Sequence, residues 1–101
     1  MLLYNITIAI DTAAENGWTA WMREQAIPEM MKSGLFIEYR FYKVLTHDDP
    51  ASASYCLQYF VNTIEQVNLY LKDHAPRFLQ MLKDRYPDQH AVFQTLLEEV
   101  R

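Results

Sequence analysis

The sequence predicts an α+β fold of the ferredoxin type: a βαββαβ sandwich with a four-stranded antiparallel sheet and two helices on one face. The first observation is the order of the periodic segments, which is strand, helix, strand, strand, helix, strand. The second is a short internal sequence similarity. Pro28 and Pro76 each lie late in a predicted helix, and each is followed two positions on by two large apolar residues. We therefore expect residues 1–101 to form one domain built from two variants of a βαβ unit.

The first half of the chain predicts a strand and a long helix. Residues 2–10 alternate between large apolar and smaller or polar side chains, which is the period of a strand. Asp11 and Thr12 end this strand and begin a helix that continues to residue 31. Lys32-Ser33-Gly34 ends the helix, because glycine readily adopts the left-handed conformation found at helix C-termini. The apolar face of the helix is predicted to comprise two rows: Trp18, Met22, Ala26 and Met30, and Trp21, Gln25, Pro28 and Met31.

The second half predicts a hairpin, a helix and a final strand. Residues 35–45 and 55–61 have strand character and are joined by turn-forming residues at 46–50. Thr63 and Gln66 have the spacing of a capping box that begins a helix, and Pro76 is expected to kink or split this helix near residues 73–75. Residues 91–100 return to strand character. The apolar stripe of the helix is predicted to comprise Ile64, Val67, Leu71, Ala75, Phe78 and Leu82.

Composition excludes several classes of function. The chain has 101 residues and a formal net charge of −4, which is the wrong sign for binding nucleic acid. No apolar run approaches the roughly 18 residues of a membrane helix, so we expect a cytoplasmic protein that does not bind membranes. Cys56 is the only cysteine, which excludes an internal disulfide and a zinc site of several thiolates. Because the chain has only two glycines and no phosphate-binding motif, no cofactor and no metal are expected.

The face of the sheet opposite the helices needs an explanation. Alternation predicts that the helices cover Tyr4, Ile6, Ile8, Ile37, Tyr39, Phe41, Leu57 and Tyr59. It predicts that the opposite face carries Asn5, Thr7, Phe36, Glu38, Arg40, Tyr42, Cys56, Gln58 and Phe60. The second set is too aromatic for a solvent surface and too polar for a dry core. Two copies packed face to face would hide its rings, so we predict a homodimer that buries on the order of 2,000 Å².

Several motifs resemble those of a bacterial family of uncharacterised proteins that is described only as a domain of unknown function. The first half carries Tyr4-Asn5-Ile6-Thr7 in the opening strand, then Trp18-Thr19-Ala20-Trp21-Met22 and Ile27-Pro28 in the helix. The second half carries the stretch from Tyr70 to Arg77, which ends in His-Ala-Pro-Arg, and Phe93-Gln94-Thr95 in the last strand. The resemblance spans nearly the whole chain.

This resemblance implies membership of the dimeric α+β barrel superfamily. That superfamily includes cofactor-free quinone-forming monooxygenases, muconolactone-isomerase-like enzymes, haem-degrading enzymes and proteins with no known activity. The resemblance therefore implies the fold and the dimer, and it leaves the chemistry open.

Five side chains are candidates for lining a ligand pocket: Trp21, His74, Arg40, Asn5 and Tyr42. His74 has the side chain most readily used as an acid or base near neutral pH, and a histidine before Ala-Pro also suits helix capping. Trp21 suits either an aromatic pocket wall or a place in the core. On the outer sheet face, Arg40 suits an anionic substrate and either Tyr42 or Glu38 suits proton relay, with Asn5 in the same polar set. The structural alternative for this polar set is an Asn–Gln hydrogen bond with a Glu–Arg pair.

The function that these features predict is a dimeric small-molecule-binding or structural protein. The alternative is a cofactor-independent monooxygenase or isomerase that acts on a small aromatic or lactone-like substrate between the sheet and the helices. Haem binding through His74 is a third alternative, but no second contact for the porphyrin is evident in the sequence. The residues leave open whether the protein catalyses a reaction.

Overall fold

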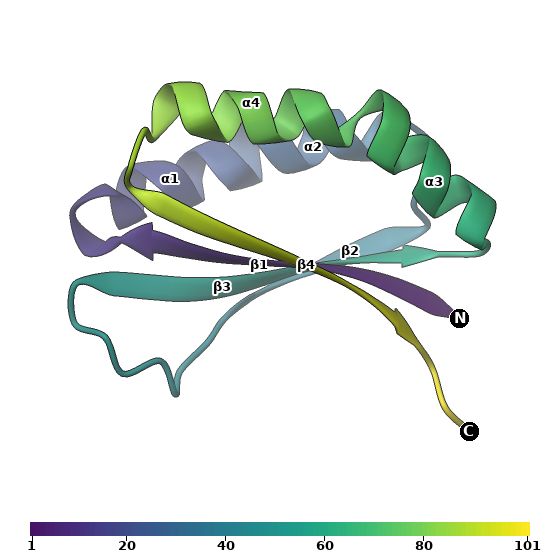
Figure 1. Cartoon of the computed structure of the whole chain (residues 1–101), viewed down its shortest axis with the longest axis horizontal. Helices are drawn as coiled ribbons and strands as arrows, with labels where there is room; N and C mark the ends of the chain where they lie inside the picture. The colour runs from purple at the N-terminus through teal and green to yellow at the C-terminus, as the bar shows by residue number, and fades with distance from the viewer.

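The computed structural model describes residues 1–101 and confirms the predicted α+β sandwich (Figure 1). All strand pairs are antiparallel, in the order β2-β3-β1-β4, and the helices cover one face of this sheet. No helix combines the length and the apolar character needed to cross a membrane. The strands are β1 (Leu2–Asp11), β2 (Glu38–Lys43), β3 (Ser52–Val61) and β4 (His90–Glu98). The helices are α1 (Glu15–Trp21), α2 (Ile27–Met31), α3 (Ile64–Asp73) and α4 (Ala75–Arg85), with a short 3-10 helix at Thr12–Ala14.

The first predicted helix contains a wide π turn in its middle. α1 and α2 are joined by a π-helical segment over Met22–Ala26, in which the N–H of Ile27 donates to the carbonyl of Met22, five residues back. Pro28 has no N–H for the carbonyl four residues before it, which favours a wider turn at this point. The extra residue changes which side chains face the sheet. Ile27 is buried, whereas Gln25 and Pro28, which were predicted in an apolar row, are exposed.

The second predicted helix is split at His74, as the position of Pro76 predicts. The proline cannot supply the N–H that would continue the hydrogen-bond ladder, so α3 ends and α4 begins at this point. The predicted capping box is present: Thr63 accepts from the backbone N–H of Gln66, and the Gln66 side chain accepts from the backbone of Thr63. The split gives two shorter helices that meet at an angle above the sheet (Figure 1).

The split also alters the predicted apolar stripe. Tyr70 is buried in α3, while Leu71, which was predicted in the stripe, is 40% exposed. Ile64 is 44% exposed because it lies in the first turn of α3, beyond the part that packs on the sheet. The side chains that α3 and α4 bury are Val67, Tyr70, Ala75, Phe78 and Leu82.

The core lies between the sheet and the helix layer. Ile6, Ile8 and Ile10 of the central strand β1 are fully buried, and Trp18 and Met22 of the first helix are fully buried above the sheet. These side chains fill the middle of the space between the sheet and the helices. Full burial of a large apolar side chain contributes about 1.5–3 kcal/mol, so these side chains stabilise the packing of the helices on the sheet.

The strand β2 begins later than the alternation predicts, and it is less covered than predicted. Phe36 was predicted on the face away from the helices, but it is buried and its ring stacks on Tyr59 with 4.2 Å between centroids. The reason is that residues 35–37 precede the strand, so the period of two does not extend back to them. Ile37 and Tyr39 were predicted under the helices and are 52% and 41% exposed, because they lie at the edge of the sheet. Tyr39 pairs directly with the buried Tyr59, so it lies on the helix side of the sheet as predicted, although it is less covered than expected.

A carboxylate joins the start of the helix layer to the hairpin. Glu15 accepts hydrogen bonds from Lys43 at 2.8 Å and from the hydroxyl of Tyr55 at 2.6 Å. These hydrogen bonds hold the pKa of the Glu15 carboxyl below its usual range, with the bond from Lys43 as the larger cause. The contact fixes α1 against β2 and β3.

Two buried tyrosines donate to the thioether of Met30, and a third buried tyrosine packs beside them. The hydroxyls of Tyr59 and Tyr70 donate to the sulfur of Met30 at 3.3 and 3.2 Å. The ring of Tyr4 packs against Tyr70 with 5.3 Å between centroids, but its buried hydroxyl has no hydrogen-bond partner. Burial raises the pKa of Tyr4 to about 12. The hydroxyl of Tyr4 is therefore buried without a hydrogen bond to replace those it would make with water.

We expect Tyr4→Phe to raise the free energy of unfolding by about 1 kcal/mol, because it removes an unpaired buried hydroxyl. Tyr70→Phe is the matched control and should lower the free energy of unfolding by about 0.5–1 kcal/mol, since it removes a hydrogen bond.

The pKa of Tyr4 is about 12 in the folded state and 10.0 in the unfolded state. The free energy of unfolding of the wild type should therefore fall as the pH rises from 10 towards 12, and it should fall less in Tyr4→Phe. Urea denaturation across this pH range measures both effects. A Tyr4→Phe protein less stable than wild type would contradict this assignment.

Candidate functional site

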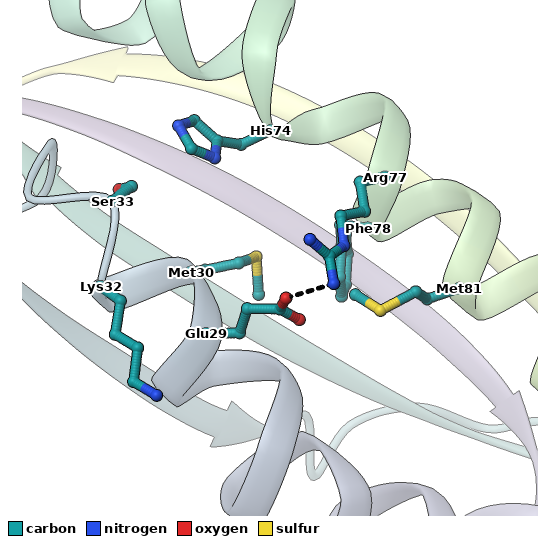
Figure 2. A pocket seen from close by; sticks show the side chains of 8 residues that line it. All are labelled: Glu29, Met30, Lys32, Ser33, His74, Arg77, Phe78 and Met81. Atoms are coloured by element: carbon teal, nitrogen blue, oxygen red, sulfur yellow. Dashed lines mark ion pairs between the residues drawn. The ribbon is translucent and has the colours of Figure 1, made fainter.

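A groove lies in the helix layer where the end of α2 meets the junction of α3 and α4 (Figure 2). Its volume is about 240 Å³. We call it the helix groove, and the residues that line it are Glu29, Met30, Lys32, Ser33, His74, Arg77, Phe78 and Met81. Three of these side chains are apolar and the others are polar or charged. The groove therefore combines an apolar floor with a polar rim, the usual arrangement of a small-molecule site.

One ion pair spans the helix groove. The guanidinium of Arg77 on α4 lies 2.7 Å from a carboxylate oxygen of Glu29 on α2, and Figure 2 shows the two side chains meeting between their helices. Both groups are well exposed, so the pair is expected to contribute no more than about 1 kcal/mol to stability. The pair places the guanidinium of Arg77 beside the apolar floor of the groove.

His74 contributes to the groove through its side chain and to the helix junction through its backbone. Its backbone N–H donates to the carbonyl of Tyr70 at 2.9 Å, which closes the end of α3. The imidazole makes no capping hydrogen bond, so the side-chain cap considered from the sequence is absent. The ring stacks on that of Tyr70 with 6.1 Å between centroids and is half-buried at the groove. Its nitrogens are available to a ligand.

Trp21 lies in the core next to the helix groove and does not line it. Only 4% of its surface is exposed, and its ring lies parallel to that of Phe78 with 6.5 Å between centroids. The guanidinium of Arg85 lies 5.0 Å from the centre of the indole ring, on which Tyr86 also packs. Phe78 therefore belongs to both the core and the groove, because it contacts Trp21 and also lines the groove.

The other three candidates lie on the sheet face opposite the helices, which we call the open face. Strand pairing places Arg40, Gln58, Asn5 and Thr95 side by side across all the strands. Directly paired residues point to the same face, so this is one polar row. The row comes from four distant parts of the chain, and only the sheet order brings it together.

Two less polar rows flank this polar row. Strand pairing aligns Tyr42, Cys56, Thr7 and Phe93 on one side of it, and Glu38, Phe60, Leu3 and Leu97 on the other. Tyr42 is 52% exposed, Phe93 is 66% exposed and Leu97 is 41% exposed. The open face therefore presents large apolar side chains on both sides of its polar centre.

Hydrogen bonds on the open face satisfy only part of the polar row. Arg40 pairs with Glu38 at 3.0 Å, as the structural alternative predicts, and its guanidinium lies 5.6 Å from the centre of the Phe60 ring. The predicted Asn–Gln hydrogen bond is absent: the amide of Asn5 donates instead to Thr7 at 3.0 Å. The side-chain oxygen of Asn5 is buried and accepts no hydrogen bond. A buried acceptor without a donor is rare in a folded chain.

The five candidate residues therefore divide between separate places. Asn5, Arg40 and Tyr42 lie together on the open face, while His74 lies in the helix groove and Trp21 lies in the core. Sequence reasoning did not single out the groove residues Glu29, Lys32, Ser33 and Met81 or the open-face residue Phe93. For the groove residues, the only signal in the sequence was the repeated proline environment near the two helix segments that meet at the groove. For Phe93, the only signal was an aromatic residue in the final strand.

Comparison with known proteins identifies a family and a fold. The family described as "Domain of unknown function (DUF4286)" matches residues 1–100. No curated protein matches the sequence. HapK from Hahella chejuensis shares 12% identity at a TM-score of 0.72, over 99% of this chain and 93% of HapK. An antibiotic biosynthesis monooxygenase shares 15% identity at a TM-score of 0.66, over 100% of both chains.

The shared fold alone does not indicate an activity. A designed protein with a ferredoxin fold, LFR1 1, also matches, with 19% identity and a TM-score of 0.57 over 100% of this chain and 89% of the designed chain. At such low identities the likeness to solved structures shows the fold and nothing finer.

We expect His74→Ala to change the free energy of unfolding by less than about 1 kcal/mol, because the imidazole makes no hydrogen bond. Phe78→Ala is the contrasting variant and should lower it by about 3–5 kcal/mol, because that ring is buried. The midpoint of urea denaturation compares the two. A large loss of stability in His74→Ala would mean that the imidazole is a structural element and not a free rim group.

Proposed function

The chain belongs to the family described as domain of unknown function DUF4286, and we propose that this protein is a homodimeric small-molecule-binding protein. The observation that carries the binding function is the helix groove, where an apolar floor meets side chains with uncommitted hydrogen-bonding groups. The dimer rests on a separate observation, the composition of the open face. The two surfaces lie on opposite layers of the sandwich, so a dimer through the sheet leaves the groove accessible.

The residues of the helix groove favour binding over catalysis. General acid–base catalysis by histidine needs an oriented imidazole, and orientation usually comes from a hydrogen-bonded carboxylate or carbonyl. His74 has no such partner, and the nearby carboxylate of Glu29 is engaged by Arg77. The groove therefore has the features of a recognition site without a prepared acid or base.

The enzyme alternative requires a substrate cavity between the sheet and the helices. The middle of that space is filled by side chains such as Ile6, Trp18 and Tyr59, none of which has measurable exposure. Similarity of fold to an antibiotic biosynthesis monooxygenase supports this alternative only at the level of architecture. We therefore favour the helix groove over a cavity between the sheet and the helices as the ligand site, and a fragment screen distinguishes these two sites.

A second copy of the chain is the partner that best fits the open face. An isologous interface brings the same surface of each copy together. Phe93, Leu97 and Tyr42, which are exposed in the single chain, would be removed from water. The Glu38–Arg40 pair carries both signs of charge, so it can meet its own copy without net repulsion. Burying two such faces gives on the order of 2,000 Å², which is typical of obligate dimers.

The binding function is tested by a fragment screen on the full chain labelled with ¹⁵N, using neutral, anionic and cationic fragments. We expect amide shifts clustered at Ser33, His74 and Phe78, with the hairpin turn at residues 46–50 unchanged as an internal control. Shifts clustered at Ile6 and Trp18 would favour the enzyme alternative. A screen without any shift at the groove would refute the proposed function.

The dimer is tested by light scattering at micromolar concentration. We expect the mass to be twice the 12.0 kDa of the chain. Phe93→Asp should give the monomer mass, because a buried unpaired carboxylate disfavours the interface. Leu69→Asp changes a comparably exposed apolar residue on α3 and should leave the dimer intact. A monomeric wild type, or equal loss of the dimer in both variants, would contradict the proposal.

A further inference from the structure

We propose that the ligand of the helix groove is a small carboxylate with an apolar chain. This inference rests on the proposed binding function and adds the chemical class of the ligand. It follows from three properties of the groove: its surplus of hydrogen-bond donors, its net charge, and the size and chemistry of its floor.

The donors of the helix groove outnumber its acceptors. One nitrogen of Arg77 is held by Glu29, which leaves other N–H groups of the guanidinium without a partner. The hydroxyl oxygen of Ser33 accepts from the N–H of Leu35 at 3.2 Å, so its own hydrogen is free to donate. The imidazole of His74 offers a further N–H. The one carboxylate in the groove, Glu29, is already paired, so the ligand must supply acceptors.

The charge of the groove favours an anion. Lys32 and Arg77 are cationic and Glu29 is anionic, which leaves one net positive charge with His74 neutral, on a chain whose formal net charge is −4. Figure 2 shows the Lys32 side chain directed away from the ion pair, so Arg77 is the cation that lies beside the apolar side chains of the groove. A guanidinium recognises a carboxylate through paired N–H groups better than it recognises a neutral oxygen.

The floor of the groove suits a short apolar chain. It is formed by Met30, Phe78 and Met81. The sulfur of Met30 is held by two tyrosine hydroxyls, whereas Met81 is only partly buried and its unbranched side chain can adapt to a guest. The volume of about 240 Å³ lies below the roughly 300 Å³ at which pockets for drug-sized ligands begin, so the ligand is small.

The test compares octanoate with octan-1-ol, which has the same chain length and no charge. We expect octanoate to bind the full protein about tenfold more tightly, because the extra free energy of a charge-assisted hydrogen bond over a neutral one corresponds to about a factor of ten in affinity. Chemical-shift titration of the ¹⁵N-labelled protein gives the dissociation constants, and shifts at Ser33 and His74 locate the site. Added salt should weaken octanoate binding and leave octan-1-ol binding unchanged.

Matched variants separate a specific contact from general charge. Arg77→Gln should reduce the preference for octanoate over octan-1-ol to less than about threefold, since one charged contact is lost. Arg85→Gln changes the same residue type on the same helix outside the groove and should keep the full preference. Both arginines are largely exposed, so both variants are expected to fold.

The outcomes distinguish this inference from the proposed function. Equal affinity for octanoate and octan-1-ol at the groove would overturn the anionic ligand class and leave the binding function standing. A preference for octan-1-ol, or equal effects of the two arginine variants, would also overturn it. If neither probe shifts the groove amides while other fragments do, the inference fails alone; if no fragment does, the binding function fails with it.

Discussion

Burial of one side of β1 is the constraint on which the rest of the structure depends. Ile6, Ile8 and Ile10 have no exposed surface, and β1 is paired on both edges by β3 and β4. A shift of one residue in either pairing would move these isoleucines to the other face, so their burial fixes the register of the central strands. The same register aligns Asn5 with Gln58 and Thr95, which makes the polar row of the open face a direct consequence of packing on the helix side.

The two prolines shape the layer that carries the groove. Pro28 follows a π turn that rotates Ile27 into the core, and Pro76 accompanies the break that places His74 between two helices. A continuous helix in either half would have kept a regular stripe of apolar residues. Because both helices are interrupted, the rim of the groove comes from one helix end and one helix junction, where side chains are less constrained by neighbours. The groove is thus a by-product of two backbone interruptions that the core tolerates.

The open face and the helix groove have complementary properties. The open face is broad, partly aromatic and nearly neutral, which suits a second copy of the same surface. The helix groove is small and richer in donors than acceptors, which suits a small ligand. The exposed groups of the open face are large apolar side chains such as Tyr42, Phe93 and Leu97, whereas the helix groove exposes free hydrogen-bond donors beside Arg77 at a solvent-accessible rim. This difference is why a protein surface is proposed for one and a small molecule for the other.

The sequence by itself determined the element order, the capping box at Thr63, the break near Pro76 and the buried row of β1, since these follow from short-range periodicity and proline geometry. It did not determine that Phe36 turns into the core, that Tyr70 replaces Leu71 in the helix stripe, or that Trp21 packs beside the groove instead of lining it. Those outcomes depend on where a strand begins and how a split helix rotates, and neither has a local signal. Only the tertiary structure decided that Glu29 meets Arg77 across two helices, because a contact between residues so distant in sequence exists only once the sheet has placed their helices side by side.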